Sequence, residues 1–454
     1  MTFSSYPEYK SSGHEWVGEI PSHWLIYRSK NIFSERNVKA LESDEQLTAS
    51  QKYGVIPQKL FSALEDQKVM QVILGRDILK KAEINDFVIS MRSFQGGLEF
   101  CSYSGAVSSA YVPLFANREI DNRFFKHLFK SIPFISALQN TSNLVRDGQA
   151  LRYNNFVQLS LPFPSLNEQR TIGAFLDHET ARIDALIEEQ QRLIELLKEK
   201  RQAVISHAVT KGLDPTVPMK DSGVEWLGEV PAHWSFKQSK YLFEFVTSGS
   251  RGWAEYYSDD GDLFFRIANL TRDSIEPKLA SIQYVTPPEN AEGERSKVRC
   301  GDILISITAD LGSVCVASDE VAGGYVSQHV ALARPVRKTV FSRWLAYFIL
   351  STTCKDQLVG AGYGGTKVQL SLEDIRSFWV SMPPYDEQIS LAAFLDREVQ
   401  AFDGLITQAA IGVDLLSERR SALISAAVTG KIDVRDWQPP ASTQAPKLEV
   451  AEAN

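Results

Sequence analysis

Two short motifs in the last third of the sequence contain residue types that could carry out chemistry. Met382–Tyr385 (MPPY) has the Pro-Pro-aromatic spacing of a loop that holds a target amino group during methyl transfer. That loop needs a polar first side chain to accept a hydrogen bond, and methionine cannot supply one. Gly360–Lys367 (GAGYGGTK) is rich in glycine like a phosphate-binding loop, but it ends Gly-Thr-Lys instead of Gly-Lys-Ser/Thr. We therefore expect neither methyl transfer nor nucleotide hydrolysis from these motifs.

The rest of the sequence offers no other set of catalytic or metal-binding residues. It has no glycine-rich strand–turn–helix suited to S-adenosylmethionine, and no Ser-His-Asp, Cys-His or paired-carboxylate arrangement stands out. The four cysteines lie far apart without a Cys-x-x-Cys pair, which predicts buried, reduced thiols. The histidines lack a second pair of ligands at metal-binding spacing. We predict a chain that is not an enzyme by itself, with no catalytic residue, no metal and no cofactor of its own.

Two long helical segments are the elements that must position any binding residues. Asn167–Thr210 contains no proline, and its apolar residues recur with heptad spacing. At about 1.5 Å per residue such a helix would span roughly 66 Å, which predicts a spacer. Asp386–Thr429 aligns with it without a gap, 219 residues later. The residues expected at the helix seam or on a partner-binding surface are Glu168, Gln169, Leu176, Ile183, Leu186, Leu197, Glu387, Gln388, Leu395, Phe402, Leu405 and Leu416.

The repeat extends beyond the helices. His14–Trp24 (HEWVGEIPSHW) shares its Glu-Trp, Gly-Glu, Pro and His-Trp residues with Glu225–Trp234 (EWLGEVPAHW). Between these frames and the helices the pattern indicates two related lobes of short strands, turns and a short amphipathic helix, which makes the fold class α+β. The predicted divisions are lobes at 1–165 and 213–384, long helices at 166–212 and 385–431, and a tail at 432–454 that is expected to be disordered.

The charge of the chain is unevenly distributed. The net charge is −8, with +3 on residues 16–165, −3 on 225–384, −2 on 166–224 and −5 on 385–454. A weakly charged lobe can grip phosphates locally but cannot hold DNA tightly by electrostatics alone, so we expect a subunit that needs partners to complete a DNA channel. No apolar run approaches ~18 residues and the N-terminus has no signal-peptide core, which predicts a cytoplasmic protein away from membranes.

The paired segments carry a specific resemblance. The most telling are Phe163–Asp177 (FPSLNEQRTIGAFLD) with Pro383–Asp396 (PPYDEQISLAAFLD), and Arg201–Gly212 with Arg420–Lys431. With the two tryptophan frames, they resemble the specificity (S) subunit of a type I restriction–modification system over roughly residues 14–435. The resemblance implies two pseudo-repeated α/β target recognition domains, each for one half of a split, asymmetric site in double-stranded DNA. They would be joined by two long antiparallel helices that form a coiled coil.

The resemblance also implies partners. The helices would set the half-site spacing and bind two methyltransferase (M) subunits, and restriction/translocase (R) subunits would complete the assembly. S-adenosylmethionine, ATP and magnesium would belong to those partner subunits. Methylation would require the methyltransferase subunits to flip the target adenine out of the duplex.

Side chains able to read base edges are Arg, Lys, Asn, Gln, Ser and Thr on loops. The DNA-contacting candidates of the first lobe are Lys52, Tyr53, Arg92, Ser93, Gln95, Arg146, Gln149, Arg152 and Tyr153. Those of the second lobe are Ser250, Arg251, Arg266, Asn269, Arg272, Tyr363, Thr366, Lys367 and Gln369.

Two other functional classes remain open. Heptad seams alone would equally fit a coiled-coil scaffold or adaptor whose lobes bind protein without DNA sequence specificity. A self-contained DNA methyltransferase is the other alternative, and the missing methyl-donor and amino-binding loops argue against it. The paired tryptophan frames and Glu-Gln helix starts favour the specificity subunit over both.

Overall fold

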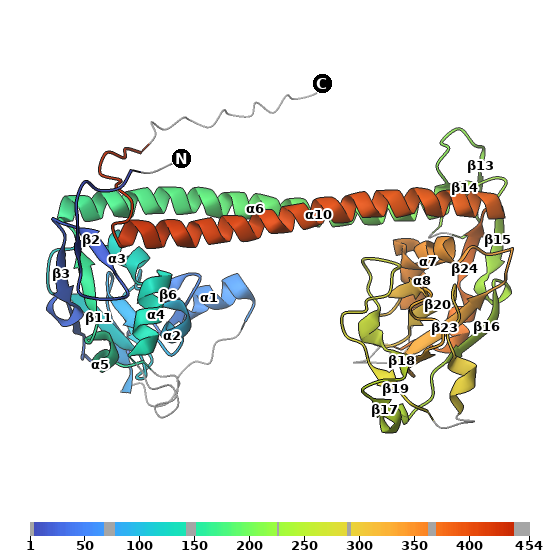
Figure 1. The fold of residues 1–454 in the computed structure, drawn as a ribbon, viewed down its shortest axis with the longest axis horizontal. Coiled ribbons are helices and arrows are strands. Elements are labelled where there is room, and N and C mark those ends of the chain that lie inside the picture. The colour runs from blue at the N-terminus through green and yellow to red at the C-terminus, as the bar shows by residue number, and fades with distance from the viewer. Residues whose placement is uncertain are drawn as a thin grey trace. The chain divides into compact units, whose positions relative to one another are not determined.

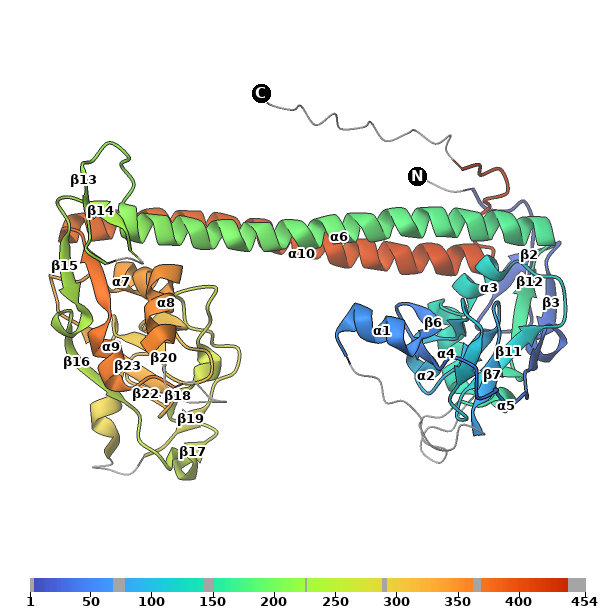
Figure 2. The same ribbon diagram turned by 180° about the vertical axis from the view of Figure 1, so that it is seen from behind.

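The computed structural model describes residues 4–67, 78–141, 151–224, 227–287, 292–361 and 369–439. Its contacts divide the chain into two compact units, residues 1–190 with 412–454 and residues 191–411. Each unit contains one lobe of short strands and helices together with part of each of two long helices (Figure 1, Figure 2). The compact units therefore differ from a serial division of the chain, because each one combines distant stretches of sequence.

The two long helices are continuous. α6 (Leu166–Lys211) has 46 residues and α10 (Tyr385–Val428) has 44. Proline is tolerated just before a helix but not inside it, and Pro164 and Pro384 stand shortly before the two helix starts. Within the second unit the helices run antiparallel, because Arg201 of α6 binds Asp403 while the later residue Gly212 faces Glu387, near the start of α10. The predicted fold class, α+β with two lobes joined by long antiparallel helices, is confirmed.

The first lobe is built on a four-stranded antiparallel sheet in the order β4-β11-β8-β9. β11 joins the two neighbouring strands, since Phe33 of β4 pairs with Ala116 and Ile89 of β8 pairs with Val112. The strands are β1 (Tyr9–Ser11), β2 (Glu19–Pro21), β3 (Leu25–Arg28), β4 (Phe33–Glu35), β5 (Leu47–Ser50), β6 (Gly54–Pro57), β7 (Lys80–Ala82), β8 (Phe87–Ile89), β9 (Glu99–Phe100), β10 (Gly105–Val107), β11 (Val112–Ala116) and β12 (Ser160–Phe163). The helices are η1 (Ser29–Asn31), α1 (Gln58–Glu65), α2 (Ser93–Gly96), α3 (Asn122–Leu128), α4 (Ile132–Asn140) and α5 (Tyr153–Phe156).

The second lobe repeats this sheet as β16-β23-β20-β21 and adds another in the order β17-β19-β18-β22. In the added sheet β18 and β22 are parallel. The strands are β13 (Met219–Asp221), β14 (Glu229–Pro231), β15 (Ser235–Gln238), β16 (Phe243–Ser248), β17 (Tyr257–Ser258), β18 (Asp262–Phe265), β19 (Tyr284–Val285), β20 (Ile303–Ser306), β21 (Val314–Val316), β22 (Tyr325–Val326), β23 (Val330–Pro335) and β24 (Trp379–Met382). The helices are η3 (Ser239–Tyr241), η4 (Trp253–Tyr256), η5 (Ile267–Asn269), η6 (Glu292–Ser296), α7 (Ser342–Leu350), α8 (Thr352–Ala361) and α9 (Leu372–Ser377).

Each lobe has its own core between the sheet, the short helices and one long helix. In the first lobe the ring of Phe33 lies 5.2 Å from that of Phe125 and 5.7 Å from that of Phe87, and Leu176 of α6 closes the same cluster. Such edge-to-face pairs contribute about 0.5–1.5 kcal/mol each beyond area burial. In the second lobe Trp344 of α7 is fully buried and packs in a cluster that includes Leu395 of α10. The long helices are therefore part of both cores.

The apolar seam of the long helices is only partly buried. Leu176, Ile183, Leu395 and Phe402 are buried as predicted, and Leu197 and Leu416 are half-buried. Leu186 and Leu405, predicted at the helix seam or on a partner-binding surface, lie outside the buried seam, because they are 39% and 50% exposed, and the partner-binding alternative stays a prediction. The reason is geometric: a straight helix drifts by about 20° per heptad, so strict heptad positions rotate away from the partner helix.

Two further expectations need correction. The tail was predicted to be disordered from residue 432, yet Val434 is buried and the Trp437 ring lies 5.7 Å from that of Phe175. Residues 440–454 lie outside the described residues. Buried thiols were expected at every cysteine, and Cys300 is exposed because it lies in the turn before β20. None of the described helices combines the length and apolar character that a membrane crossing requires.

Candidate nucleic-acid interface

A buried glutamate at the start of α6 anchors the first lobe. Glu168 Oε1 accepts hydrogen bonds from the Tyr6 hydroxyl (2.8 Å) and Trp24 Nε1 (2.9 Å), and Oε2 lies 3.0 Å from His23 Nε2. A carboxylate in the first turn is stabilised by the positive end of the helix dipole. Burial and the hydrogen bond to Glu168 raise the pKa of Tyr6, so its hydroxyl stays a donor. The His-Trp pair of the frame therefore fixes the start of α6 against the first lobe.

The same anchor recurs in the second lobe. Glu387 of α10 accepts from Trp234 Nε1 (3.1 Å) and lies 2.9 Å from His233 Nε2. Its side chain is 31% exposed, compared with 4% for Glu168, so the second anchor is the wetter one. In the first lobe, the frame residue Trp16 is half-buried and packs on Phe134.

The glutamine that follows each glutamate bridges helix start and lobe. Gln169 Nε2 donates to the carbonyl oxygen of Pro164 (2.9 Å), and its Oε1 accepts from the amide of Asp121 (3.0 Å). Gln388 does the same with Pro383 (3.0 Å) and Phe341 (2.8 Å). The prediction that Glu168, Gln169 and Gln388 lie at the seam or on a partner surface is therefore wrong, because all three are buried against their own lobes, whereas for the half-buried Glu387 it stays a prediction.

A buried aspartate fixes the start of the central strand in each lobe. Asp86, before β8, binds Arg36 of the neighbouring β4–β5 connection through hydrogen bonds of 2.7 and 2.9 Å. Asp302, before β20, binds Arg334 of β23 through bonds of 2.8 and 2.7 Å. Both carboxylates are 2% exposed. Loops follow the C-terminal ends of β8 and β20. The two ion pairs therefore fix the strands from which these loops extend.

The first lobe brings three loops together, and we call residues 50–53, 90–97 and 108–111 its loop group. A Cβ on Gly96 would lie 2.5 Å from Gln51 Nε2, so the turn of the β5–β6 hairpin rests on α2. Val112 pairs with Ile89, which places the loop before β11 beside the loop after β8. Burial raises the pKa of Tyr111, and the positive charge of Arg92 acts in the opposite direction. Lys52, Tyr53, Arg92 and Gln95 all belong to this group.

The candidates of the first lobe differ in their availability. Arg92, Gln95 and Arg152 are exposed. Lys52 is also exposed, but it and Tyr53 both bind Glu65 of α1, at 3.1 and 2.8 Å. Because Lys52 is exposed, it can leave Glu65 and move to a phosphate. The Tyr53 hydroxyl is partly occupied by its bond to Glu65.

Two candidates of the first lobe are wrong, and two are outside the described residues. Ser93 is fully buried, and its hydroxyl accepts from the amide of Ser90 (2.8 Å) as a turn residue. Tyr153 is half-buried and donates to the carbonyl oxygen of Phe33 (3.3 Å), at the end of β11 opposite the loop group. Arg146 and Gln149 lie outside the described residues.

The second lobe gathers the loops that follow four of its strands. β16, β18, β20 and β22 all end at one edge. The amide of Ser327 donates to Phe265 (2.8 Å), and a Cβ on Gly249 would lie 1.8 Å from the carbonyl oxygen of Val326. The amide of Ile307 donates to His329 (3.2 Å). The loop group of the second lobe consists of residues 249–252, 266–269, 307–312 and 327–329. It also includes Gln369, which pairs with Thr308.

Arg266 and Ser327 contain polar atoms without partners in the centre of this group. Arg266 Nε and Ser327 Oγ are buried, and neither makes a hydrogen bond to any described residue. Among the described residues, Arg266 Nη2 contacts Ser281 Oγ, at 3.5 Å. Leaving a buried polar group unsatisfied costs about 1–3 kcal/mol. A polar ligand at this edge would relieve that cost.

The remaining candidates of the second lobe take different roles. Arg251 and Gln369 are exposed, and Ser250 is half-buried. Asn269 is a wrong candidate, because it is 1% exposed and donates to the carbonyl oxygens of Lys278 (2.9 Å) and Ser281 (3.0 Å). Arg272 is exposed but bound to Asp310 at 2.5 Å, so it shapes the loop at 307–312. Tyr363, Thr366 and Lys367 lie outside the described residues.

Sequence reasoning missed Ser327, Gln328 and His329. Gln328 and His329 are exposed, with 3.1 Å between Gln328 Nε2 and His329 Nε2. The available signal was a Ser-Gln-His run between two short apolar stretches. Among the described residues, no group of three or more His, Cys, Asp and Glu side chains could hold a metal ion.

The chain is similar to proteins of one family in sequence. The profile of the "Type I restriction modification DNA specificity domain" matches residues 280–409. The EcoBI type I restriction enzyme specificity subunit of Escherichia coli is 21% identical over 361 residues, covering 78% of this chain and 74% of that protein. The MjaVIII specificity subunit of Methanocaldococcus jannaschii is 21% identical over 427 residues, covering 92% and 95%.

The fold is also shared with solved structures. A chain from a study of complex assembly and conformational transition of the type I R-M system has a TM-score of 0.66 at 18% identity, covering 91% of this chain and 99% of that one. The HsdS subunit from Thermoanaerobacter tengcongensis has a TM-score of 0.52 at 18% identity, covering 91% and 98%. In its duplicated anchors, its long helices and the stretch that the profile matches, this chain is similar to type I restriction–modification specificity subunits.

Proposed function

We propose that each lobe reads one half of a bipartite, asymmetric site in double-stranded DNA, as the specificity subunit of a type I restriction–modification complex. One observation supports this most directly: equivalent anchors hold loop groups whose residues differ. Glu168 and Glu387 bind the same His-Trp pair in both lobes. The loops carry Arg92 and Gln95 in one lobe and Arg251 and Arg266 in the other. Duplicated supports with different reading residues suit an asymmetric target.

Direct readout is the chemistry that we assign to the loop groups. Arginine can donate two hydrogen bonds to guanine, and glutamine can bind adenine in the same two-pronged way. Arg266, whose Nε lacks a partner, is the strongest reader of the second lobe, and Ser327 stands beside it. In the first lobe Arg92 and Gln95 have this role, while Lys52 contacts a phosphate.

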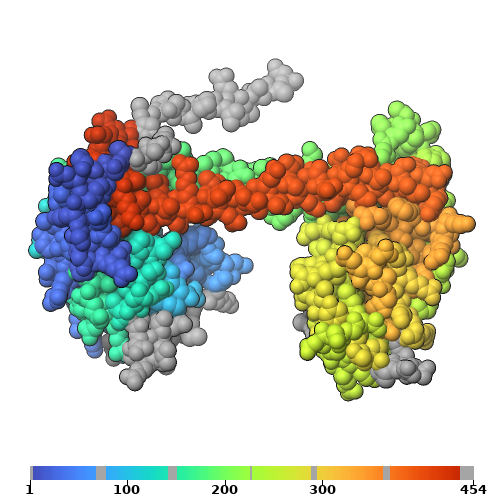
Figure 3. All heavy atoms as spheres, in the orientation of Figure 1, coloured from blue at the N-terminus to red at the C-terminus, as the bar shows by residue number. Residues whose placement is uncertain are grey.

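We assign the long helices to spacing and to the docking of methyltransferase subunits. Leu186, Leu193, Leu405 and Leu415 are between 39% and 60% exposed on α6 and α10. Figure 3 shows a face of α10 that the lobes leave uncovered. Large aliphatic side chains exposed along a helix are typical of a surface that another protein covers.

The chemistry is assigned to partner subunits. In this proposal the chain is non-catalytic, and the methyltransferase subunits bring S-adenosylmethionine. Restriction subunits use ATP and magnesium. The second-lobe charge of −3 fits this division, because DNA held by a weakly charged lobe needs contacts from other chains.

The test is a methylome. The full chain is expressed with its methyltransferase subunits in cells, and the methylated motif is read by sequencing. Arg266→Ala should relax the motif at positions of one half-site and leave the other half-site intact, at a cost of about 1–3 kcal/mol in site discrimination. Lys237→Gln, on exposed β15 outside the loop group, is the control. A motif unchanged by Arg266→Ala, or an equal loss of binding on unrelated DNA, would count against base reading by this residue.

A further inference from the structure

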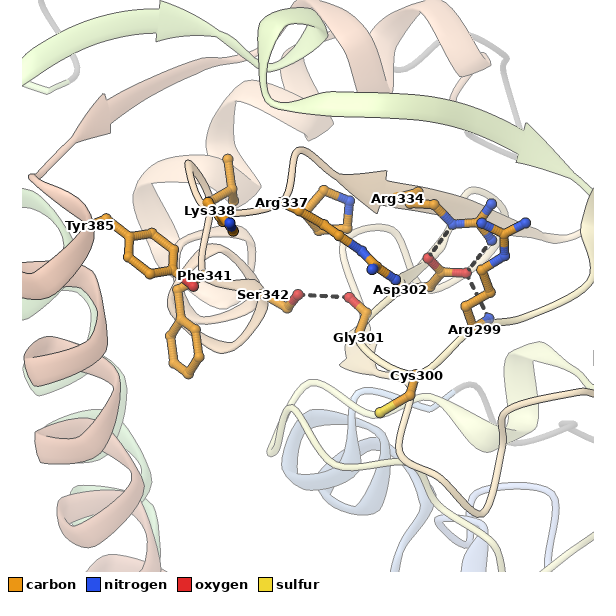
Figure 4. A pocket seen from close by; sticks show the side chains of 12 residues that line it. Arg299, Cys300, Gly301, Asp302, Arg334, Arg337, Lys338, Phe341, Ser342 and Tyr385 are labelled. Atoms are coloured by element: carbon orange, nitrogen blue, oxygen red, sulfur yellow. Dashed lines mark hydrogen bonds and ion pairs between the residues drawn. The ribbon is translucent and has the colours of Figure 1, made fainter.

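A basic cavity lies in the second lobe, away from the loop group. It has a volume of about 320 Å³ and is lined by residues 299–302, by residues around the end of β23 and by the start of α7 (Figure 4). Phe243 pairs with Pro335, and Ile303 pairs with Ala333. This is the edge of the β16-β23-β20-β21 sheet opposite to Ser248 and Ser306, where the loop group is found. The cavity is therefore separate from the proposed base-reading edge.

Positive charge dominates the wall of this cavity. Of its four cations, only Arg334 is neutralised, because it binds the buried carboxylate of Asp302 through two hydrogen bonds. Arg299, Arg337 and Lys338 are exposed, and none of their side chains pairs with a carboxylate among the described residues. Glu244 stands nearby, but it accepts from the backbone amide of Arg337 (3.4 Å). Three charged side chains therefore remain free to bind an anion.

The start of α7 adds hydrogen-bond donors to the same wall. Phe341 and Ser342 line the cavity. Phe341 is the N-cap residue and its amide donates to Gln388 Oε1, but no side chain of the described residues caps the following amides in the first turn of this nine-residue helix. Uncapped first-turn amides, with the positive end of the helix dipole, favour a negative group.

The first lobe has carboxylates at the corresponding positions. Asp121 caps α3 by accepting from the amide of Arg123 (3.0 Å), where the second lobe has Phe341 at the start of α7. Glu83 occupies the position of Arg299 in the aligned turn and binds Arg36 at 3.0 Å. The repeat thus places two acidic side chains where the cavity has an arginine and an uncapped helix.

We infer that this cavity binds the phosphate groups of a small anion such as pyrophosphate or the phosphate chain of a nucleotide. Guanidinium groups match phosphate oxygens in pairs, and an ammonium supplies a further point charge. Arg299 and Arg337 lie on opposite sides of the Asp302–Arg334 pair, which holds the turn and the end of β23 in place. A phosphate between them is also within the field of the α7 amides. The inference does not depend on the reading of DNA half-sites.

Calorimetric titration of the full chain with pyrophosphate, and separately with ATP, tests this inference. The wild-type chain should bind one anion, and Arg299→Gln with Arg337→Gln should weaken binding by about tenfold or more, since each removes a charged hydrogen-bond donor. Both side chains are exposed, so the double variant should keep its fold, which its circular dichroism and melting temperature verify. The control, Lys237→Gln with Arg295→Gln, removes the same charge from exposed positions that do not line the cavity.

A competition arm identifies the source of the phosphate. If duplex DNA without a target site displaces pyrophosphate from the wild-type chain, the cavity takes a backbone phosphate. If an excess of that duplex leaves pyrophosphate bound, the ligand is a free small anion. Absence of pyrophosphate and ATP binding at millimolar concentration, or equal binding by the wild-type chain and the double variant, would overturn the inference. The inference would also be overturned if the control variant weakened pyrophosphate binding as much as the double variant does. That result would show a diffuse charge effect.

Discussion

Arg420 of α10 donates two hydrogen bonds to Asp184 of α6, from Nε at 2.7 Å and from Nη2 at 3.0 Å. The residues 219 positions away in each repeat, Arg201 and Asp403, also bind each other, through Arg201 Nη1, with the helices exchanged. The first pair lies in one compact unit and the second pair in the other. Each repeat thus supplies the arginine of one pair and the aspartate of the other, which specifies antiparallel helices and their register.

The two arginines should differ in their contribution to stability. Arg201 is 9% exposed and also binds Asp273 at 2.7 Å, whereas Arg420 is 37% exposed. Arg201→Ala should lower the free energy of unfolding by about 2–3 kcal/mol, since it removes charged hydrogen bonds from a buried site. Arg420→Ala should cost about 0.2–1 kcal/mol. Urea unfolding of both variants compares them, and an equal loss would contradict this ranking.

The anchor glutamates should also differ. Glu168→Ala leaves the buried donors of Tyr6 and Trp24 without an acceptor, so we expect a loss of about 3 kcal/mol. Glu387→Ala should cost less, because that side chain is 31% exposed and water can replace it. Hydrogen exchange of the first turn of each long helix measures both effects. Tyr6→Phe is the control, since it removes one donor and should cost about 1 kcal/mol. Greater loss of protection in the Glu387 variant would contradict the assignment.

The length of the helices should determine the spacing of the half-sites. We expect that seven residues inserted after Gln190 and seven after Ile411 will keep the heptad register and lengthen each helix by about 10.5 Å. That is close to three base pairs, at about 3.4 Å per base pair. A methylome of cells carrying this variant with its methyltransferase subunits should show the same half-sites with a spacer about three base pairs longer. Spacing that stays the same would show that the helices do not set it.

Exposed leucines on the long helices should affect assembly and not folding. Leu405→Glu and Leu193→Glu replace side chains that are 50% and 43% exposed, so the melting temperature of the isolated chain should change little. Co-purification with methyltransferase subunits should fall sharply, because a charge in an apolar interface is costly. Lys198→Glu is the matched control, since Lys198 is an exposed residue of α6 that contacts Glu195. Full assembly of both leucine variants would exclude these positions from the docking surface.

The packing of the C-terminal segment onto the first lobe should depend on pH. The hydrogen bond from Arg435 lowers the pKa of Asp433, whose amide donates to Ser4 (2.8 Å). A lowered pKa contributes stability above the unfolded value of ~3.9, and that contribution is lost as the pH falls through the folded value. Tryptophan emission, compared with Trp437→Phe, should therefore report loosening at acid pH. Asp433→Asn should show the emission of the loosened segment already at neutral pH. Identical emission profiles against pH for this variant and the wild type would contradict the role of Asp433.

Much of the architecture could be predicted from the sequence, because periodicity and duplication are local properties. Proline-free heptads gave the two long helices, and the gapless 219-residue repeat placed equivalent residues in both. The exposed candidates Arg92, Gln95, Arg251 and Gln369 lie in loop groups as expected from their residue types. Residue type alone could not separate them from Ser93 and Asn269, which are buried because their polar groups close turns of the backbone.

Tertiary structure alone decided the roles of the anchors and the unpartnered atoms. From the sequence, a Glu-Gln pair at a helix start looks like a pair of exposed polar residues. The fold places Trp24 or Trp234, about 150 residues away, in contact with its glutamate. Ser327 became a candidate only when β18 and β22 paired and left its hydroxyl beside Arg266 without an acceptor. The physical reason is that sequence fixes what a side chain can donate or accept. Which donors remain unsatisfied depends on contacts between segments that are distant in the chain.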